Sequence, residues 1–151
     1  MEWDQGLRRE FRKTVVLAVF ILVVNPVIFL ALAVFLNISA RTGGEVDMMF
    51  YMLLMAAIAS PAAMPLIERF HINRYRSDKT SKMSPGQLLT SISIVKFAFV
   101  EAAYVCGLIV YITSGDMARM LCFYPIGIAW SVFCRPRRSQ WENLINKMGS
   151  P

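Results

Sequence analysis

The stretch that decides the fold runs from Leu88 to Gly115 and reads LLTSISIVKFAFVEAAYVCGLIVYITSG. It is long enough to cross a bilayer, since about 20 apolar residues in a helix span the hydrocarbon core. It also contains two charged residues, Lys96 and Glu101. A charged side chain near the bilayer centre costs about 2.5–3.5 kcal/mol on insertion scales, so such residues usually have partners and a function. The stretch therefore predicts a membrane helix around which the other segments are arranged.

The composition of the whole chain also indicates several membrane spans. Of the 151 residues, 56% are hydrophobic and 17% are charged, which is too apolar for a soluble domain of this size. The net charge is +6, but the basic residues lie in blocks beside the apolar runs, as membrane topology requires, so we do not expect nucleic acid as a partner. The three cysteines lie in apolar segments without the spacing of a metal site, so we expect neither a metal nor a cofactor.

Four apolar segments are long enough to be spans. The first is free of charge over 23 residues, which corresponds to about 34 Å of helix. The fourth, with 18 residues, is near the lower limit for crossing. The expected spans cover about residues 14–36, 48–67, 88–114 and 117–134. We predict an all-α polytopic membrane protein, a four-transmembrane-helix bundle forming a single domain over residues 1–151.

Local signals mark where these helices bend and begin. Pro26 lies in the middle of the first span and is expected to kink it, because proline lacks the amide donor. Pro61 and Pro65 should bend or loosen the end of the second span. Ser84 and Gln87 form a capping-box pattern, which predicts that the third helix begins directly after Ser84.

Amphipathic segments flank the bundle at both ends. Trp3, Leu7 and Phe11 recur at helical spacing among basic residues, the pattern of a short helix at a membrane interface. Residues 139–148 repeat this pattern, with Ser139 as the expected N-cap. We therefore predict short interfacial helices at both termini.

The distribution of lysine and arginine predicts the orientation. The N-terminus, the loop 68–87 and the C-terminus carry 4, 5 and 4 of them, whereas the other two connections carry only Arg41 and Arg119. By the positive-inside bias, both termini and the loop 68–87 should face the cytoplasm, in the cell inner membrane. The residues expected to meet anionic phospholipid headgroups are Lys96, which can snorkel to the interface, and Arg69, Arg74, Arg76, Lys79 and Lys82.

Glu101 is the candidate functional residue. It lies about 20 Å along the helix from Leu88, too deep for its short side chain to reach either surface, so it must face protein or water. Lys96 is about 140° away around the helix, so the two charges should have separate partners. Tyr104 could donate a hydrogen bond to the carboxyl, and Asn25 lies in the middle of the first span. A low dielectric favours the neutral carboxyl, which can exchange a proton or simply bond two helices together.

Small residues surround Glu101 on its helix. Ala98, Ala102 and Cys106 form one row, and Ala103 with Gly107 forms another. Small residues at a spacing of four let helix backbones approach closely in lipid. Both rows therefore predict tight packing against neighbouring helices.

The segment 87–112, QLLTSISIVKFAFVEAAYVCGLIVYI, resembles the carboxylate-bearing helix of the ion-translocating proteolipid (c) subunits of rotary ATP synthases. The similarity centres on Phe99-Val100-Glu101-Ala102 and on Gly107-Leu108-Ile109-Val110. It covers this one helix. The resemblance implies that Glu101 is similar to the ion-binding carboxylate of that family.

The sequence contains no pairing of nucleophile and base, no P-loop and no dinucleotide fingerprint, so we do not expect an enzyme. The first expectation is an accessory or structural subunit, in a homo-oligomer or a larger membrane complex, with Glu101 as the polar centre of its helix packing. The alternative is a proton- or cation-binding transport element that uses Glu101 with Tyr104 and Asn25. A lipid-modifying enzyme is a more distant third.

Overall fold

The computed structural model describes residues 4–39, 44–77 and 83–149, and within these ranges every regular element is a helix. Four helical units are long and apolar enough to cross a membrane, judged by length and composition: Gln5–Leu36, Glu45–Ser77, Pro85–Ser114 and Met117–Cys134. The elements are α1 (Gln5–Val19), the π-helical η1 (Phe20–Val24), α2 (Asn25–Leu36), α3 (Gly44–Ala59), the 3-10 helix η2 (Ser60–Ala63), α4 (Met64–Ser77), α5 (Pro85–Ser114), α6 (Met117–Leu121), α7 (Phe123–Cys134) and α8 (Arg138–Gly149).

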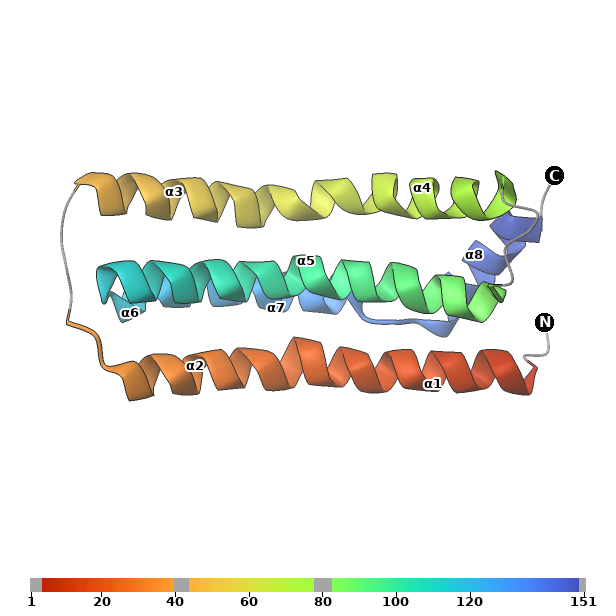
Figure 1. Cartoon of the computed structure of the whole chain (residues 1–151), viewed down its shortest axis with the longest axis horizontal. Helices are drawn as coiled ribbons and strands as arrows, with labels where there is room; N and C mark the ends of the chain where they lie inside the picture. Colours follow the sequence, from red (N-terminus) through yellow and green to blue (C-terminus); the bar gives the residue numbers. More distant parts are fainter. Residues whose placement is uncertain (1–3, 40–43, 78–82, 150–151) are drawn as a thin grey trace.

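Helix α5 lies at the centre of the bundle (Figure 1). The unit α1–η1–α2 runs along one side of it and α3–η2–α4 along the other, while α6 and α7 pack against its remaining face. Phe97, Val100 and Val110 on α5 are fully buried. The stretch that carries both charges is therefore the one that the rest of the chain surrounds.

The N-terminal segment is continuous with the first long helix, because α1 passes through η1 into α2 in one direction (Figure 1). The helix expected at the N-terminus is therefore present as the first turns of this long unit, and its position at a membrane interface stays a prediction. Leu7 and Phe11 pack against Leu89 and Trp141, and the Phe11 and Trp141 rings meet edge to face at 5.2 Å. The apolar side chains of this segment are therefore partly covered by α5 and α8. Trp3 lies outside the described residues.

A turn of π-helix accommodates Pro26. The backbone N–H of Asn25 donates to the carbonyl of Phe20, five residues earlier. Pro26 thereby falls in the first turn of α2, where its missing N–H removes no required hydrogen bond. The expected kink is replaced by a local widening of the helix.

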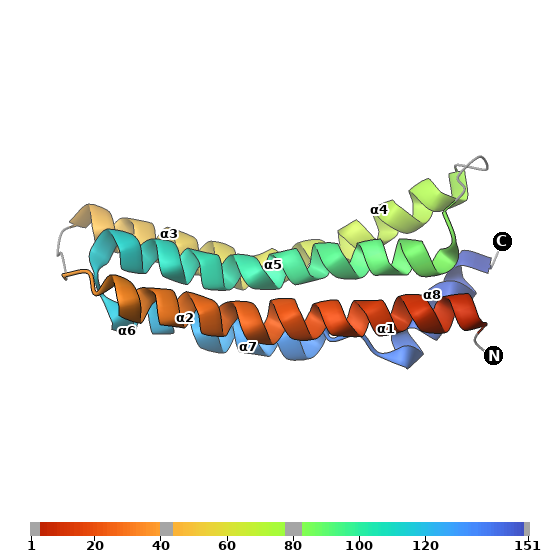
Figure 2. The ribbon, with the colours of Figure 1, turned by 60° about the horizontal axis from the view of Figure 1, so that its bottom comes forward.

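The second long unit departs from α-helical geometry near Pro61 and Pro65, where the sequence predicted a disturbance. Its helix tightens to 3-10 geometry over Ser60–Ala63, and α4 then diverges from α5 (Figure 2). The expected loop 68–87 is largely wrong, because α4 stays helical to Ser77. Ile72 and Tyr75 pack against Leu88 and Ile92 of α5, which stabilises the extra turns. Arg69, Arg74 and Arg76 therefore lie on a helix, whereas Lys79 and Lys82 lie outside the described residues.

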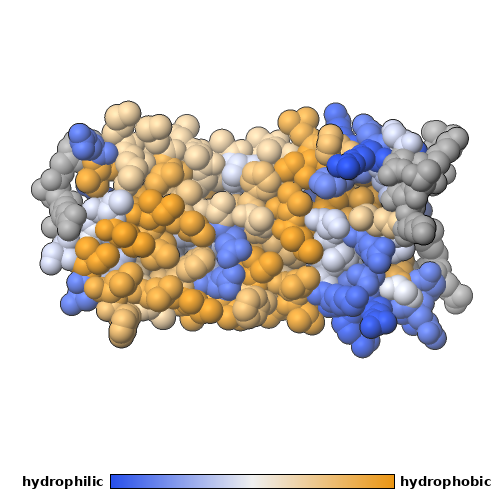
Figure 3. Space-filling model, viewed as in Figure 1, coloured by the Kyte–Doolittle hydropathy of each residue, from blue (hydrophilic) through white to orange (hydrophobic). Residues whose placement is uncertain are grey.

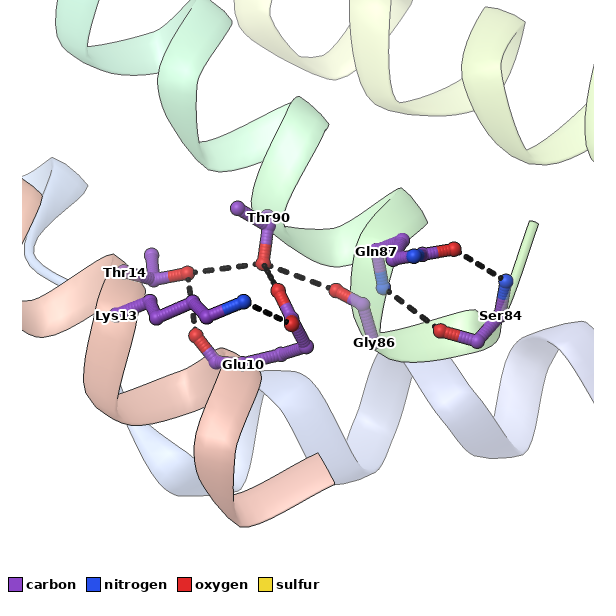
Figure 4. A network of polar contacts seen from close by, with 7 residues as sticks. All are labelled: Glu10, Lys13, Thr14, Ser84, Gly86, Gln87 and Thr90. Carbon is purple, nitrogen blue, oxygen red and sulfur yellow. Dashed lines mark hydrogen bonds and ion pairs between the residues drawn. The ribbon is translucent and has the colours of Figure 1, made fainter. Parts of the chain in front are cut away.

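The ends of α5 are those the sequence predicted. Ser84 Oγ accepts a hydrogen bond from the Gln87 backbone N–H, and the Gln87 side chain accepts one from the Ser84 N–H (Figure 4). Gly115 ends the helix at a φ of 67°, in the left-handed region that glycine tolerates best. Asp116 then caps α6 through the N–H groups of Ala118 and Arg119.

The C-terminal helix is present but differs in two respects from the prediction. It begins at Arg138, so Ser139 lies inside it and is not its N-cap. Trp141 is 3% exposed and packs against Leu89. The apolar face of α8 therefore covers the end of the bundle and does not lie open to headgroups.

Candidate functional site

Glu101 of α5 and Asn25, the first residue of α2, form a polar pair between two long apolar helices. Asn25 Nδ2 donates a hydrogen bond of 2.6 Å to Glu101 Oε1. Both side chains are half-buried. The structure thus brings together two of the three residues that the sequence singled out for this site.

The π turn and its surroundings determine where Asn25 points. An extra residue in one turn rotates the residues that follow by about 100° relative to an uninterrupted α-helix. The turn is held against α7, because Tyr124 Oη donates a 2.9 Å hydrogen bond to the Pro26 carbonyl. Pro26 itself is buried. Asn25 is therefore fixed by backbone geometry and by a neighbouring helix.

The pair lies at the surface of this chain, within its apolar zone. Both residues are half-buried, so part of each reaches the surface, and Figure 3 shows a small hydrophilic patch inside the hydrophobic band. Among the described residues, no partner occupies the second carboxyl oxygen, Oε2. A neutral carboxylic acid has one donor and retains acceptor capacity. Glu101 Oε1 thus has a hydrogen-bond partner within the chain, and Oε2 can still bond to a group outside the described residues.

Tyr104 does not join this pair. It is 1% exposed, and its ring lies 5.2 Å from that of Tyr124 in an edge-to-face arrangement. The expected hydrogen bond to Glu101 is wrong, since none links the two side chains in the described part of the chain. Three positions along a helix leave residues about 60° apart, and that difference turns Tyr104 towards α7.

Only one of the two rows of small residues makes a close helix contact. Ala103 and Gly107 are buried, and a Cβ added at Gly107 would lie 3.0 Å from the Met120 carbonyl oxygen. Ala98 and Ala102 are exposed. The expectation of tight packing holds for the Ala103 row. In the other row it is wrong for Ala98 and Ala102, whereas Cys106 packs against the buried cluster that contains Ala103.

Lys96 is paired with Glu68 of α4. Their side chains are 19% and 29% exposed, so the pair is largely enclosed by the two helices. The sequence did not predict this carboxylate partner, and the expected reach of Lys96 towards headgroups stays a prediction. The prediction that Lys96 and Glu101 have separate partners is confirmed. Glu68 was missed because it follows directly on the second expected span and was assigned to a loop.

A second polar network, which the sequence did not point to, joins α1 to the start of α5 (Figure 4). The hydroxyl oxygens of Thr14 and Thr90 are 3.1 Å apart, and Thr90 also lies 3.4 Å from Glu10 Oε2. Lys13 neutralises Glu10 at 2.7 Å. Threonine is common in membrane helices, and Thr14 and Thr90 are far apart in the chain, so the sequence alone did not predict this contact.

The two ends of the molecule differ in charge. Hydrophilic residues gather most densely at the end that carries both termini (Figure 3), where Arg69, Arg74 and Arg76 lie on α4. At the opposite end Arg119 is neutralised by Asp47 at 2.6 Å and Asp116 at 3.1 Å. This arrangement concentrates positive charge on one side of the apolar zone.

Within the described ranges, no group of three or more His, Cys, Asp or Glu side chains could hold a metal ion. The chain matches no protein-family model, no curated protein and no solved structure. The Asn25–Glu101 pair and the charge asymmetry are therefore the features from which a function can be inferred.

Proposed function

We propose that this chain is a small integral protein of the cell inner membrane and serves as an accessory or structural subunit, with Glu101 as the polar centre of its helix packing. The observation that carries the proposal is the 2.6 Å hydrogen bond from Asn25 to Glu101, which ties two long apolar helices together. In lipid, where helices gain little from the hydrophobic effect, hydrogen bonds between helices contribute to their association.

The surface position of the pair supports a subunit role. Lipid tails offer no partner to Oε2, so a protonated Glu101 has an unused donor at the apolar surface. A helix of a second copy, or of another membrane protein, can accept that hydrogen bond. Ala98 and Ala102 lie exposed on the same helix, and small side chains allow such a helix to approach.

The orientation follows from the charge asymmetry. The basic end carries Arg69, Arg74 and Arg76 on α4 together with both termini. Under the positive-inside bias this end faces the cytoplasm, where anionic headgroups meet it.

The second candidate is a proton- or cation-binding transport element. It is favoured by the half-buried position of Glu101 and by its free Oε2 among the described residues, since exchange needs access. It is also the role that the resemblance to the ATP synthase proteolipid implies. Asn25 would orient the carboxyl, and Tyr104 would act only through helix packing.

Carbodiimide labelling distinguishes the two candidates, because apolar carbodiimides attack protonated carboxyls within reach of lipid. The purified protein in vesicles is treated across a range of pH, with and without sodium, and the modified fraction of Glu101 is measured by mass spectrometry. A structural role predicts that the modified fraction of Glu101 changes neither with pH nor with sodium. A fraction that falls as pH rises, or that sodium suppresses, would favour transport. Glu101→Gln should abolish the label and Glu68→Gln should leave it.

A further inference from the structure

A groove of about 640 Å³ separates the unit α1–η1–α2 from α7. Aliphatic side chains form its walls, and they are open to the surroundings: Val19 is 54%, Val23 57%, Val27 63%, Ile128 56% and Val132 53% exposed. The groove therefore lies in the surface that would meet lipid tails.

The few polar groups in this groove are already bonded within the protein. Tyr124 Oη donates to the Pro26 carbonyl at 2.9 Å, and Ser131 Oγ donates to the Gly127 carbonyl at 2.7 Å. Since these groups need no further partner, the groove presents an apolar surface. The part of any ligand that lies along it must be apolar as well.

One end of the groove is basic. Arg135 and Pro136 line it there, and Val15 is shared with an adjoining hollow of about 510 Å³ lined by Arg8, Phe11, Arg12 and Arg138. Arg138 is paired with Glu142 at 3.1 Å. Arg8, Arg12 and Arg135 have no ion pair within the described part of the chain. The apolar groove thus opens onto uncompensated guanidinium groups.

We infer that this groove holds an acyl chain of an anionic glycerophospholipid, with the phosphate placed among Arg8, Arg12 and Arg135. The wall from Val15 to Leu30 rises about 22 Å, and one lipid tail reaches about 15 Å, half of the hydrocarbon core. Guanidinium forks match phosphate oxygens in geometry and charge. Basic pockets between membrane helices are known to take anionic headgroups.

This inference rests on the proposed insertion of the helices into a bilayer and is independent of the role of Glu101. The protein is reconstituted in vesicles of equal parts phosphatidylcholine and phosphatidylglycerol and extracted in mild detergent, and the retained lipids are counted by native mass spectrometry. The wild type should retain phosphatidylglycerol in preference to phosphatidylcholine. Arg12→Gln and Arg135→Gln should each lower that preference about fivefold.

Arg74→Gln is the matched control, because Arg74 is exposed at the same basic end on α4, outside the groove. It should leave retention unchanged. Ile128→Trp should fill the groove and lower retention of both lipids, with circular dichroism verifying its helix content. Equal retention of the two lipids by the wild type would overturn the inference, as would an equal loss in Arg74→Gln and Arg135→Gln. Failure of insertion is recognised separately, since the protein would not float with the vesicles.

Discussion

Asn25 and Glu101 are 76 positions apart in the chain, yet Asn25 Nδ2 lies 2.6 Å from Glu101 Oε1. The bond joins an amide to a carboxyl and needs no second charge. A neutral Glu101 accepts it through its carbonyl oxygen as an ionised one would. The pair therefore allows a carboxyl to lie deep in the apolar zone without the full cost of a buried charge.

A glutamine at position 101 should preserve the stability of the fold, whereas a leucine there should lower it. Glu101→Gln keeps an oxygen acceptor for Asn25, so we expect little change in the free energy of unfolding. Glu101→Leu and Asn25→Leu each remove the bond, and a double-mutant cycle should give a coupling energy of about 0.6–1.7 kcal/mol. Denaturation of the refolded protein in bicelles measures these values. A Glu101→Gln variant as destabilised as Glu101→Leu would contradict the hydrogen-bonding role.

The need of Glu101 for a partner was predictable from its depth, but the geometry of the pair was not. It depends on the π turn over Phe20–Val24. Pro26 indicates that the helix is disturbed here, but it does not say whether the chain bends or takes a π turn. Tyr104 illustrates the same limit. Glu101 and Tyr104 lie on neighbouring faces of α5, and the packing of the whole bundle decides which face meets α7. Here Gly127 of α7 leaves room for the Tyr104 ring.

Reversing the charge of Lys96 or of Glu68 alone should lower the free energy of unfolding, and reversing both together should restore it. Removing one partner of a buried ion pair costs about 3 kcal/mol, and reversing one charge adds repulsion between like charges, so Lys96→Glu and Glu68→Lys should each destabilise the packing of α4 on α5 by at least that amount. The double variant returns opposite charges to the same two helices. Unfolding free energies of the three variants test this. Equal loss in the double and single variants would mean that the pair does not hold α4.

The true end of α4 shows why this pair was missed. Helical segments beyond a span resemble loops when they are rich in arginine, and residues 68–77 contain three arginines. The helix continues because Ile72 and Tyr75 find apolar partners on α5. Such contacts depend on the tertiary arrangement, whereas the capping box at Ser84 is local and was predicted correctly.

Alanine at position 127 should disrupt the contact between α5 and α7. A Cβ there would lie 2.4 Å from Cζ of Tyr104, and overpacking of this kind costs about 1–3 kcal/mol. The loss should exceed the gain in helix propensity that alanine brings, about 1 kcal/mol. Gly86→Ala is the control, since the nearest atom to an added Cβ there is Glu10 Cβ at 3.3 Å, a contact that a shift of a few tenths of an ångström relieves.

Shortening the tyrosine should then rescue the glycine variant. Tyr104→Leu in the Gly127→Ala background removes the ring atoms with which the new methyl group collides, so part of the lost unfolding free energy should return. Thermal unfolding followed by circular dichroism measures the effect. Gly127→Ala as stable as the wild type would show that the ring can move aside freely. A loss that Tyr104→Leu does not restore would show that the collision with the ring is not its cause.

Cysteine labelling should place the two ends of the bundle on opposite sides of a membrane. Ser39→Cys and Ser77→Cys are conservative, and both serines are exposed at opposite ends of the long helices. They are introduced after the free cysteines Cys106, Cys122 and Cys134 are changed to alanine. By the positive-inside bias, a membrane-impermeant maleimide should label position 39 in intact spheroplasts and position 77 only in inverted vesicles. Labelling of both positions from one side would overturn the proposed topology, because an odd number of crossings must separate them.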